Sequence, residues 1–280
     1  MSVPRIGVAL GGGGARGLAH IAMLEAFDEL GIKPQRIAGT SMGALVGAAY
    51  ASGFEARELR EHAQQTLSNR VKLARRLLSR SDASIAALIS FESFGPLMVN
   101  GLRLTQLFFP KGVAENIEDT KIPFTVSATD YFDRKEIIIG KGGLREAVAA
   151  SIAIPGLIAA PRIHDRFVID GGMVNPVPIS HVKKHVDITV SIDVTGGPVP
   201  GGPRRPTNTE LIFGASQIMQ RQIALLRRRD NPPDIAIEPS VEKFKVLEFF
   251  KIRRILEAAE PAKERLKRQL EIAIEREMKN

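Results

Sequence analysis

Cysteine and tryptophan are absent from this chain of 280 residues, and aromatic residues make up only 5% of it. The lack of cysteine rules out disulfides, thiolate metal sites and a cysteine nucleophile. So few aromatic side chains argue against a stacking platform for single-stranded nucleic acid, and we expect no nucleic-acid partner. No apolar run approaches the roughly 18 residues of a membrane-spanning helix, and no stretch has the pattern of a signal peptide. Nothing demands a metal or an organic cofactor, and we expect a cytoplasmic globular protein.

Acidic residues are outnumbered by basic ones, 31 to 39, which gives a formal net charge of +8. Two patches concentrate the basic residues. Such patches attract anionic lipid or nucleic acid, or they are solvated helix faces, and the sequence leaves these readings open. The patches consist of Arg70, Lys72, Arg75, Arg76 and Arg80, and of Arg227, Arg228 and Arg229.

The first fifty residues alternate between strand and helix patterns. A buried strand over residues 5–10 runs into four glycines, and a helix follows over residues 15–30. A second strand reaches Thr40, and another helix continues to Gly53. This β-α-β-α order predicts a three-layer α/β/α fold with a mostly parallel central sheet.

The rest of the chain suggests a first domain up to about residue 195 and a helical C-terminal extension. Four glycines and four prolines between residues 196 and 206 indicate a linker or mobile loop. Residues 207–280 then read as helical, with the last helix broken or restarted at Pro261. Within the first domain, helices are expected over 55–80, 143–152 and 178–185, and strands over 123–128, 135–139, 167–169 and 187–194.

A nucleophile elbow is indicated by Gly39-Thr40-Ser41-Met42-Gly43, which has the spacing G-x-S-x-G. In such an elbow the serine lies on a sharp turn between a strand and a helix. Gly39 and Gly43 would let the two elements approach closely while the hydroxyl of Ser41 faces a cleft. The motif therefore predicts attack on a carbonyl group.

A glycine-rich loop over residues 11–17 contains G-x-G-x-x-G as Gly12, Gly14 and Gly17. It follows a strand and opens a helix, so its backbone N–H groups would face an anion, either a carbonyl oxyanion or a pyrophosphate. A dinucleotide fold needs an acidic residue at the end of the second strand. No Asp or Glu lies between Glu29 and Glu55, which favours the oxyanion hypothesis.

A base for the serine is harder to find, because a Ser-Asp-His hydrolase carries its histidine late in the chain. His181 and His185 lie four residues apart on an expected helix, and a solvated basic face explains them better than a zinc site. Asp170 is a better candidate, since it ends an apolar strand and is followed by Gly171 and Gly172. On its own, Asp-Gly-Gly is more typical of a plain turn.

Taken together, the glycine loop, G-x-S-x-G and D-G-G resemble the patatin-like phospholipase family. Residues 150–161 and 170–178 extend the match, although this chain has Ala159 where the family often has phenylalanine. The resemblance covers roughly residues 5–195, and neither the basic segment 67–80 nor the chain beyond residue 206 is part of it.

The resemblance implies a Ser-Asp dyad without histidine, with Ser41 as nucleophile and Asp170 as proton acceptor. It also implies an oxyanion loop formed by Gly12, Gly13, Gly14 and Gly17, with Arg16 at the loop's basic position. The implied reaction is hydrolysis of acyl esters in phospholipids, lysophospholipids or neutral lipids through an acyl-enzyme. A non-catalytic lipid-binding or protein-binding member of the fold stays an alternative, and a dinucleotide-binding oxidoreductase a weaker one.

Residues 67–109 could form a cap or an interfacial segment. An apolar stripe at helical spacing is flanked there by the first basic patch, as peripheral binding to the anionic inner membrane surface would require. The apolar residues 83–109 could cover an acyl pocket, or both stretches could be ordinary packing. The sequence does not indicate head group, chain length, sn-position or oligomeric state.

Overall fold

The computed structural model describes residues 4–67, 99–163, 165–198 and 205–279. The N-terminal elements follow the predicted alternation, except that the first helix opens with one 3₁₀ turn. The basic patch at 70–80, and with it the outer part of the expected 55–80 helix, lies outside the described residues, as do residues 83–98. The elements are β1 (Ile6–Leu10), η1 (Gly14–Leu18), α1 (Ala19–Glu29), β2 (Arg36–Thr40), α2 (Met42–Ala51) and α3 (Ala56–Leu67).

The middle of the chain forms a second group of strands and short helices. Only four residues of the expected 178–185 helix are helical, because the chain has left the helix by His185, which lies in the turn after α8. The elements are β3 (Val99–Asn100), α6 (Gly101–Phe108), η2 (Ile117–Asp119), β4 (Phe124–Asp130), β5 (Lys135–Ile139), α7 (Leu144–Ser151), β6 (Ile158–Ala159), β7 (Arg162–Ile163), β8 (Arg166–Asp170), η3 (Gly171–Met173), α8 (Ser180–Lys183) and β9 (Ile188–Ile192).

The main sheet has the strand order β10-β9-β1-β2-β4-β8-β7, with β5 also paired to β4. Strands β10, β9, β1, β2 and β4 are parallel to one another, whereas β5 and β8 run antiparallel to β4. The central sheet is therefore mostly parallel, as predicted.

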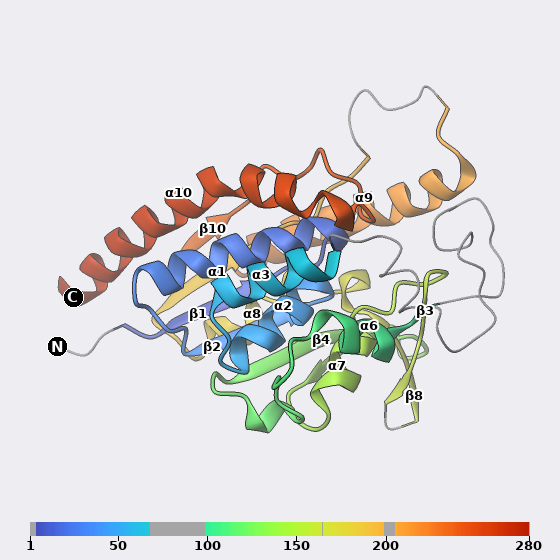
Figure 1. Ribbon diagram of the computed structural model, residues 1–280, viewed down its shortest axis with the longest axis horizontal. Helices are drawn as coiled ribbons and strands as arrows, with labels where there is room; N and C mark the ends of the chain where they lie inside the picture. The colour runs from blue at the N-terminus through green and yellow to red at the C-terminus, as the bar shows by residue number, and fades with distance from the viewer. Residues whose placement is uncertain (1–3, 68–98, 164, 199–204, 280) are drawn as a thin grey trace.

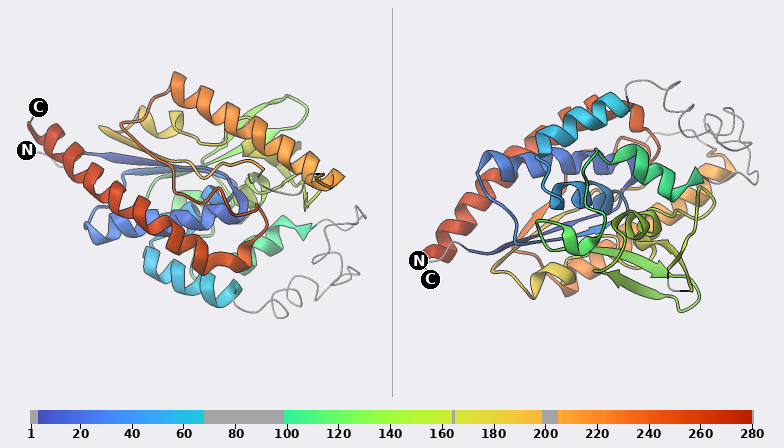
Figure 2. Two further views of the ribbon diagram at one scale, coloured as in Figure 1. Left: turned by 90° about the horizontal axis from the view of Figure 1, so that it is seen from above. Right: turned by 60° about the horizontal axis from the view of Figure 1, so that its bottom comes forward.

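Alternate residues of the central strands enter two separate cores, as the two-residue period of a strand requires. In β1, Val8 and Leu10 join the larger core, which α1, α2, α3 and α10 cover. Ala9 and Ala38 face the other way and pack against α8 and Ala224. Helices thus lie on both faces of the sheet (Figure 2), which confirms the three-layer α/β/α fold.

The chain beyond residue 205 adds to this sheet and to its core. Strand β10 (Ile235–Ile237), which the sequence pattern did not predict, pairs with β9, and α9 (Asn208–Asp230) lies on the face of α8. Helix α10 (Ile252–Lys279) follows the short η4 (Phe249–Lys251) and runs along α1 (Figure 1). The expected division at 196–206 stays a prediction, although the segments on its two sides share one sheet.

Helix α10 continues through Pro261, so the expected break there is wrong. Proline removes one backbone hydrogen bond, but Pro261 lies on the exposed side of the helix. On the inner side, Ala259 and Ala262 stay buried against the core. Packing on both sides of the proline therefore keeps the helix continuous.

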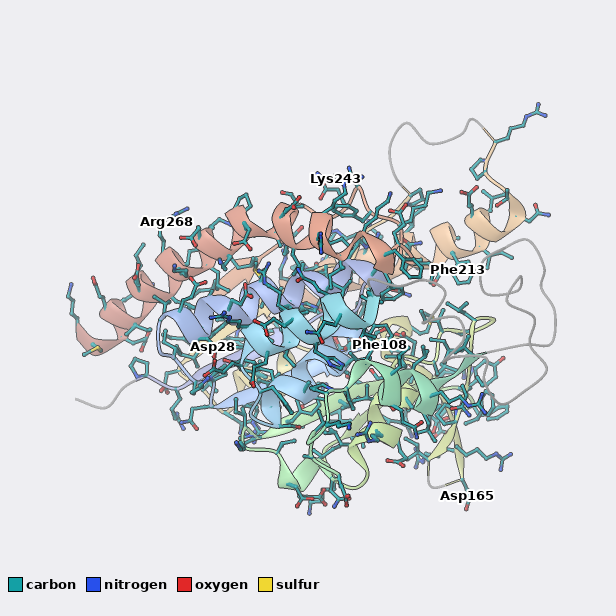
Figure 3. The ribbon with its side chains drawn as sticks, in the orientation of Figure 1. Asp28, Phe108, Asp165, Phe213, Lys243 and Arg268 are labelled. Atoms are coloured by element: carbon teal, nitrogen blue, oxygen red, sulfur yellow. The ribbon has the colours of Figure 1, made fainter. Side chains whose placement is uncertain are left out.

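Buried and half-buried ion pairs tie the helices of the larger face together. Arg60 of α3 contacts Glu25 of α1 and Glu260 of α10. Asp28, labelled in Figure 3, accepts hydrogen bonds from the hydroxyl of Tyr50 and the N–H of Ala56, each at 2.8 Å. These contacts link α1 to α2, α3 and α10 on one face of the sheet.

Candidate active site

Ser41 and Asp170 meet because β2 and β8 approach each other end to end along β4. The first half of β4 pairs with β2, with Thr40 opposite Ser127. The second half pairs with the antiparallel β8, with Asp170 opposite Ala128. The two strands therefore end at adjacent positions of β4, and the residues at their ends face one another.

Ser41 has a strained backbone, with φ 53° and ψ −120°, between β2 and α2. L-residues rarely adopt a positive φ, and such strain is typical of a nucleophile elbow. The two flanking glycines are sterically required: a Cβ on Gly39 would lie 2.5 Å from the Cα of Ala44, and one on Gly43 would overlap the carbonyl of Leu10. The predicted G-x-S-x-G motif thus folds as a sharp strand-to-helix turn.

The hydroxyl of Ser41 donates a 2.6 Å hydrogen bond to Oδ2 of Asp170. The other carboxylate oxygen, Oδ1, accepts from the N–H of Gly172 at 2.7 Å. Gly171 is needed beside them because a Cβ there would overlap the carbonyl of Ser127. The two glycines of the D-G-G motif therefore hold Asp170 with one oxygen directed at the serine.

Burial raises the pKa of Asp170 to about 6, against the opposing effect of its hydrogen bonds from Ser41 and Gly172. Asp170 as a whole is only 3% exposed, so its charged form loses most of its hydration. The carboxylate is therefore a stronger base than an ordinary aspartate, yet it is mostly ionised at neutral pH.

The glycine-rich loop lies directly beside the serine. A Cβ on Gly12 would lie 3.1 Å from the Cβ of Ser41. The N–H of Gly12 donates to the carbonyl of Pro176, and that of Ala15 to the carbonyl of Val246. Within the described residues, the N–H groups of Gly13 and Gly14 between them have no hydrogen-bond partner. Two backbone donors are thus available next to Ser41.

Arg16 carries a buried guanidinium in the same pocket. Its Nη2 donates to Oε1 of Gln217 at 3.1 Å, whereas Nε and Nη1 are buried without a hydrogen-bond partner in the described part of the chain. Burial lowers its pKa to about 10, partly offset by Asp193. The pocket is lined by Gly12, Gly13, Gly14, Arg16, Ser41, Ile154, Asp170, Phe213, Ser216, Gln217, Gln220 and Val246.

Gly17 has a packing role at the far end of the loop. A Cβ there would lie 2.5 Å from the Cβ of Met42, the residue after the serine. His20 follows on α1, where its Nε2 lies 2.7 Å from the carbonyl oxygen of Gly11, and burial lowers its pKa to about 4. The imidazole is therefore neutral and supports the loop. No histidine of the described residues hydrogen-bonds to Ser41 or Asp170.

A buried polar cluster behind the dyad was not predicted from the sequence. The N–H of Ser41 donates to Oγ of Ser151 at 2.7 Å, and that hydroxyl donates to the carbonyl of Ser127 at 2.6 Å. The hydroxyl of Ser127 in turn donates to Oε1 of Glu136 at 2.7 Å. A chain of hydrogen bonds therefore connects the backbone of Ser41 to β5.

Glu136 is the centre of this cluster. Its Oε1 also accepts from Nδ2 of Asn175 at 2.8 Å and lies 2.7 Å from Nε2 of His181. Burial alone would raise the pKa of Glu136, but hydrogen bonds from His181, Ser127 and Asn175 lower it. Asn175 reaches back to the elbow, because its carbonyl accepts from the hydroxyl of Thr40 at 2.8 Å. No short motif marks Glu136, so only the fold reveals it.

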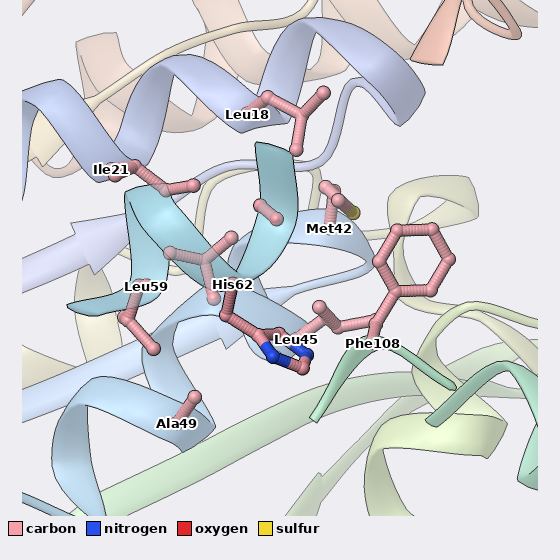
Figure 4. A pocket seen from close by; sticks show the side chains of 10 residues that line it. Leu18, Ile21, Met42, Leu45, Ala49, Leu59, His62 and Phe108 are labelled. Carbon is pink, nitrogen blue, oxygen red and sulfur yellow. The ribbon is translucent and has the colours of Figure 1, made fainter. Parts of the chain in front are cut away.

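An apolar pocket, separate from the pocket beside Ser41, lies between α2 and the helices α1, α3 and α6 (Figure 4). Met42 and Phe108 lie at one end of it, and Ala49 lies at the other. Its lining consists of Leu18, Ile21, Met42, Leu45, Val46, Ala49, Leu59, His62, Ala63 and Phe108. Apart from His62, every side chain that lines it is apolar.

The described residues contain no group of three His, Asp or Glu side chains that could hold a metal ion. The end of β2, where a dinucleotide fold would need an acid, carries Thr40 with its hydroxyl committed to Asn175. Among the helices in the described ranges, none combines the length and the apolar character needed to cross a bilayer.

Comparison with known proteins finds a matching family and several relatives of this chain. The family model for patatin-like phospholipase matches residues 8–183. An uncharacterized NTE family protein of Mycobacterium bovis is 36% identical over 205 residues, which are 73% of this chain and 52% of that protein. The lysophospholipase NTE1 of Pyricularia oryzae is 26% identical over 280 residues, which are 90% of this chain and 18% of that protein. VipD from Legionella pneumophila aligns in structure with a TM-score of 0.48 and 14% identity, over 95% of this chain and 67% of that one. The chain spans about half, or less, of the length of these curated relatives.

Proposed function

This chain belongs to the patatin-like phospholipase family, and we propose that it hydrolyses acyl esters of lipids with Ser41 as nucleophile and Asp170 as base. The observation that carries the proposal is the 2.6 Å hydrogen bond from Oγ of Ser41 to Oδ2 of Asp170 at a strained strand-to-helix turn. The relative named lysophospholipase supports the same reaction class.

In the first half of the reaction, Oγ of Ser41 attacks the ester carbonyl carbon while Oδ2 of Asp170 takes the hydroxyl proton. The tetrahedral oxyanion accepts hydrogen bonds from the N–H groups of Gly13 and Gly14. One such preorganised donor is worth about 2.7–4 kcal/mol of transition-state stabilisation. The intermediate then collapses: the bond to the alcohol oxygen breaks, and the alcohol leaves with the proton held by Asp170.

The second half of the reaction reverses these roles with water. Asp170 takes a proton from a water molecule as its oxygen attacks the acyl-enzyme carbonyl. Breaking the bond to Oγ releases the fatty acid, and Ser41 recovers the proton from Asp170. A base with a pKa of about 6 suits both steps, because it is ionised at neutral pH and still accepts a proton readily.

Phospholipids rank first among the lipid esters because of Arg16. Its Nε and Nη1 are buried in the pocket lining without a hydrogen-bond partner among the described residues, and Asp193 offsets only part of the burial; a buried cationic donor is costly unless an anion pairs with it. A phosphate in the leaving group would supply that anion. The expected cytoplasmic location and the binding to an anionic membrane through residues 67–80 stay predictions.

A fluorophosphonate probe tests the catalytic assignment directly. Wild type should be labelled, and Ser41→Ala should abolish both labelling and turnover of a p-nitrophenyl ester. Ser216→Ala, which removes a second serine hydroxyl of the same pocket, should still be labelled. Asp170→Asn should lose turnover while it keeps its fold.

Two results would reject the proposal. Labelling that persists in Ser41→Ala would move the nucleophile elsewhere. A folded wild type that neither reacts with the probe nor turns over an ester would favour a non-catalytic member of the fold.

A further inference from the structure

Four consecutive glycines, Gly11 to Gly14, begin the loop that carries the two available N–H groups beside Ser41. Because glycine has no Cβ, it gives the backbone more conformational freedom than any other residue. An oxyanion hole, in contrast, needs donors whose direction is fixed before the reaction begins. Contacts from outside the four glycines must therefore set the shape of this loop.

Three of these contacts are hydrogen bonds between backbone groups. The N–H groups of Gly11, Gly12 and Ala15 each donate to a carbonyl outside the loop, at 2.8 to 3.0 Å. The fourth contact comes from a side chain, because Nε2 of His20 donates to the carbonyl of Gly11 at 2.7 Å. Among the described residues, no other side chain hydrogen-bonds to the backbone of residues 11–15. His20 is therefore the anchor of the loop that a substitution can remove.

His20 and Pro176 hold the same peptide unit of the loop from its two sides. The peptide between Gly11 and Gly12 is planar and trans, so its carbonyl and its N–H point in opposite directions. The carbonyl accepts from His20, and the N–H donates to the carbonyl of Pro176. These two hydrogen bonds oppose rotation of the peptide plane. The N–H of Gly13 belongs to the next peptide, so its direction depends on the plane that His20 holds.

The buried imidazole of His20 is a costly side chain for packing alone. It is 0% exposed, and burial lowers its pKa to about 4, so it is neutral at pH 7 and carries one ring proton. That proton lies on Nε2, because a carbonyl oxygen can only accept. Nδ1 is left buried without a hydrogen-bond partner in the described part of the chain, which lowers stability. The one hydrogen bond that His20 makes therefore points to a role in the loop.

We propose that His20 is a positioning residue of the ester hydrolysis: by holding the carbonyl of Gly11, it directs the N–H of Gly13 at the oxyanion. The inference rests on the proposed function for the reaction that it affects. His20 does not line the active-site pocket, and it hydrogen-bonds to neither Ser41 nor Asp170. It therefore acts through the loop, and its loss should lower kcat and leave KM nearly unchanged. A displacement of about 1 Å in such a group can cost about a hundredfold in rate.

A pair of substitutions at His20 separates the hydrogen bond from the packing. Methionine and glutamine have side chains of similar length, but only glutamine ends in a group that can donate to the carbonyl of Gly11. With a p-nitrophenyl ester, His20→Met should lower kcat at least about tenfold and leave KM within about twofold of wild type. His20→Gln should restore kcat to within about threefold of wild type.

Two further measurements distinguish positioning from a general loss of structure. Met23→Ala opens a cavity in the same helix, where Met23 is fully buried in the larger core. This control should be less stable in urea but should keep the kcat of wild type. The pH profile of His20→Met should keep its midpoint near 6, because Asp170 keeps its surroundings.

A folded His20→Met protein with the kcat of wild type overturns the inference, and so does a His20→Gln protein that is as slow as His20→Met. A shifted midpoint, or an equal loss of kcat in Met23→Ala, also overturns it. Nitrogen-15 NMR of histidine-labelled wild type needs no variant: one imidazole should stay neutral down to about pH 5 with its proton on Nε2, and a proton on Nδ1 would exclude the hydrogen bond. If wild type neither reacts with the fluorophosphonate probe nor turns over the ester, the proposed function itself fails. If wild type is active and His20→Met matches it, only the role of His20 fails.

Discussion

Asp170→Asn should make the protein more stable at neutral pH while it removes the proposed catalytic base. The unfolded carboxyl ionises near its ordinary pKa of 3.8, whereas burial raises the pKa to about 6 in the folded protein. Between these pH values the folded state holds a proton that the unfolded state has lost. Stability therefore falls as the pH rises through this window.

The size of the effect follows from the two pKa values. One pKa unit corresponds to about 1.4 kcal/mol, so ionising the buried Asp170 costs the native state about 3 kcal/mol above pH 6. Asparagine carries no charge at any pH and can still accept from the N–H of Gly172 through its oxygen. The difference in unfolding free energy between variant and wild type should be small near pH 4 and reach about 3 kcal/mol by pH 7.

Urea unfolding of both proteins from pH 4 to pH 8 measures this difference, and the control described next is followed down to pH 2. Asp187→Asn is the control with the opposite sign. Hydrogen bonds from Arg5 lower the pKa of Asp187 to about 2, so that variant should lose stability above pH 4 and approach wild type as the pH falls toward 2. A difference between Asp170→Asn and wild type that stays constant from pH 4 to pH 8 would refute the reasoning.

Three further predictions concern the same site. In wild type, kcat/KM for a monomeric ester should rise between pH 5 and pH 7 with a midpoint near 6, as Asp170 loses its proton; a profile that is flat there would exclude it as the base. Gly43→Ala should cost about 2 kcal/mol or more in urea unfolding because its Cβ would overlap the carbonyl of Leu10. Gly31→Ala, where φ is +66° and no atom lies within 4 Å, should cost only about 1 kcal/mol. Glu136→Gln should lower kcat with little change in KM, since Glu136 positions the elbow without reaching the substrate pocket. A variant whose kcat/KM falls only because KM rises, with kcat unchanged, would contradict that role.

The local geometry of the site could be predicted from the sequence because each motif constrains its own backbone. The close approach of strand and helix around Ser41 requires glycine at Gly39 and Gly43, and the five-residue motif G-x-S-x-G indicates this requirement in the sequence. The same holds for the glycine loop, whose position between a strand and a helix follows from the hydrophobic pattern. Short-range steric rules thus predict where the reactive groups lie on their elements.

Contacts between distant segments could not be predicted in this way. Glu136 lies on a strand of ordinary composition, and its partners Ser127, Asn175 and His181 come from three other segments. The carbonyl of Val246, far along the chain, accepts from the N–H of Ala15 in the glycine-rich loop. No periodicity or motif encodes these pairings, because they depend on which strands become neighbours.

Pro261 shows the same limit in a single residue. Local propensity predicts a break, since proline costs roughly 3 kcal/mol in a helix interior. The structure keeps one continuous helix because Leu256 and Leu266, on opposite sides of the proline, are both buried in the same core. Tertiary packing therefore outweighs the local preference.

The register of β8 on β4 decides whether the dyad exists at all. Three residue pairs hold the two strands, and a slip of one residue would turn the side chain of Asp170 to the opposite face of the sheet. Two contacts at the ends of this pairing oppose a slip: the hydroxyl of Thr129 donates to the carbonyl of Asp170, and Arg166 pairs with Asp130. Because the strands meet end to end, the serine and the carboxylate are 2.6 Å apart, a gap that leaves no room for an imidazole between them. The topology therefore explains how Ser41 and Asp170 come into direct contact with no histidine between them.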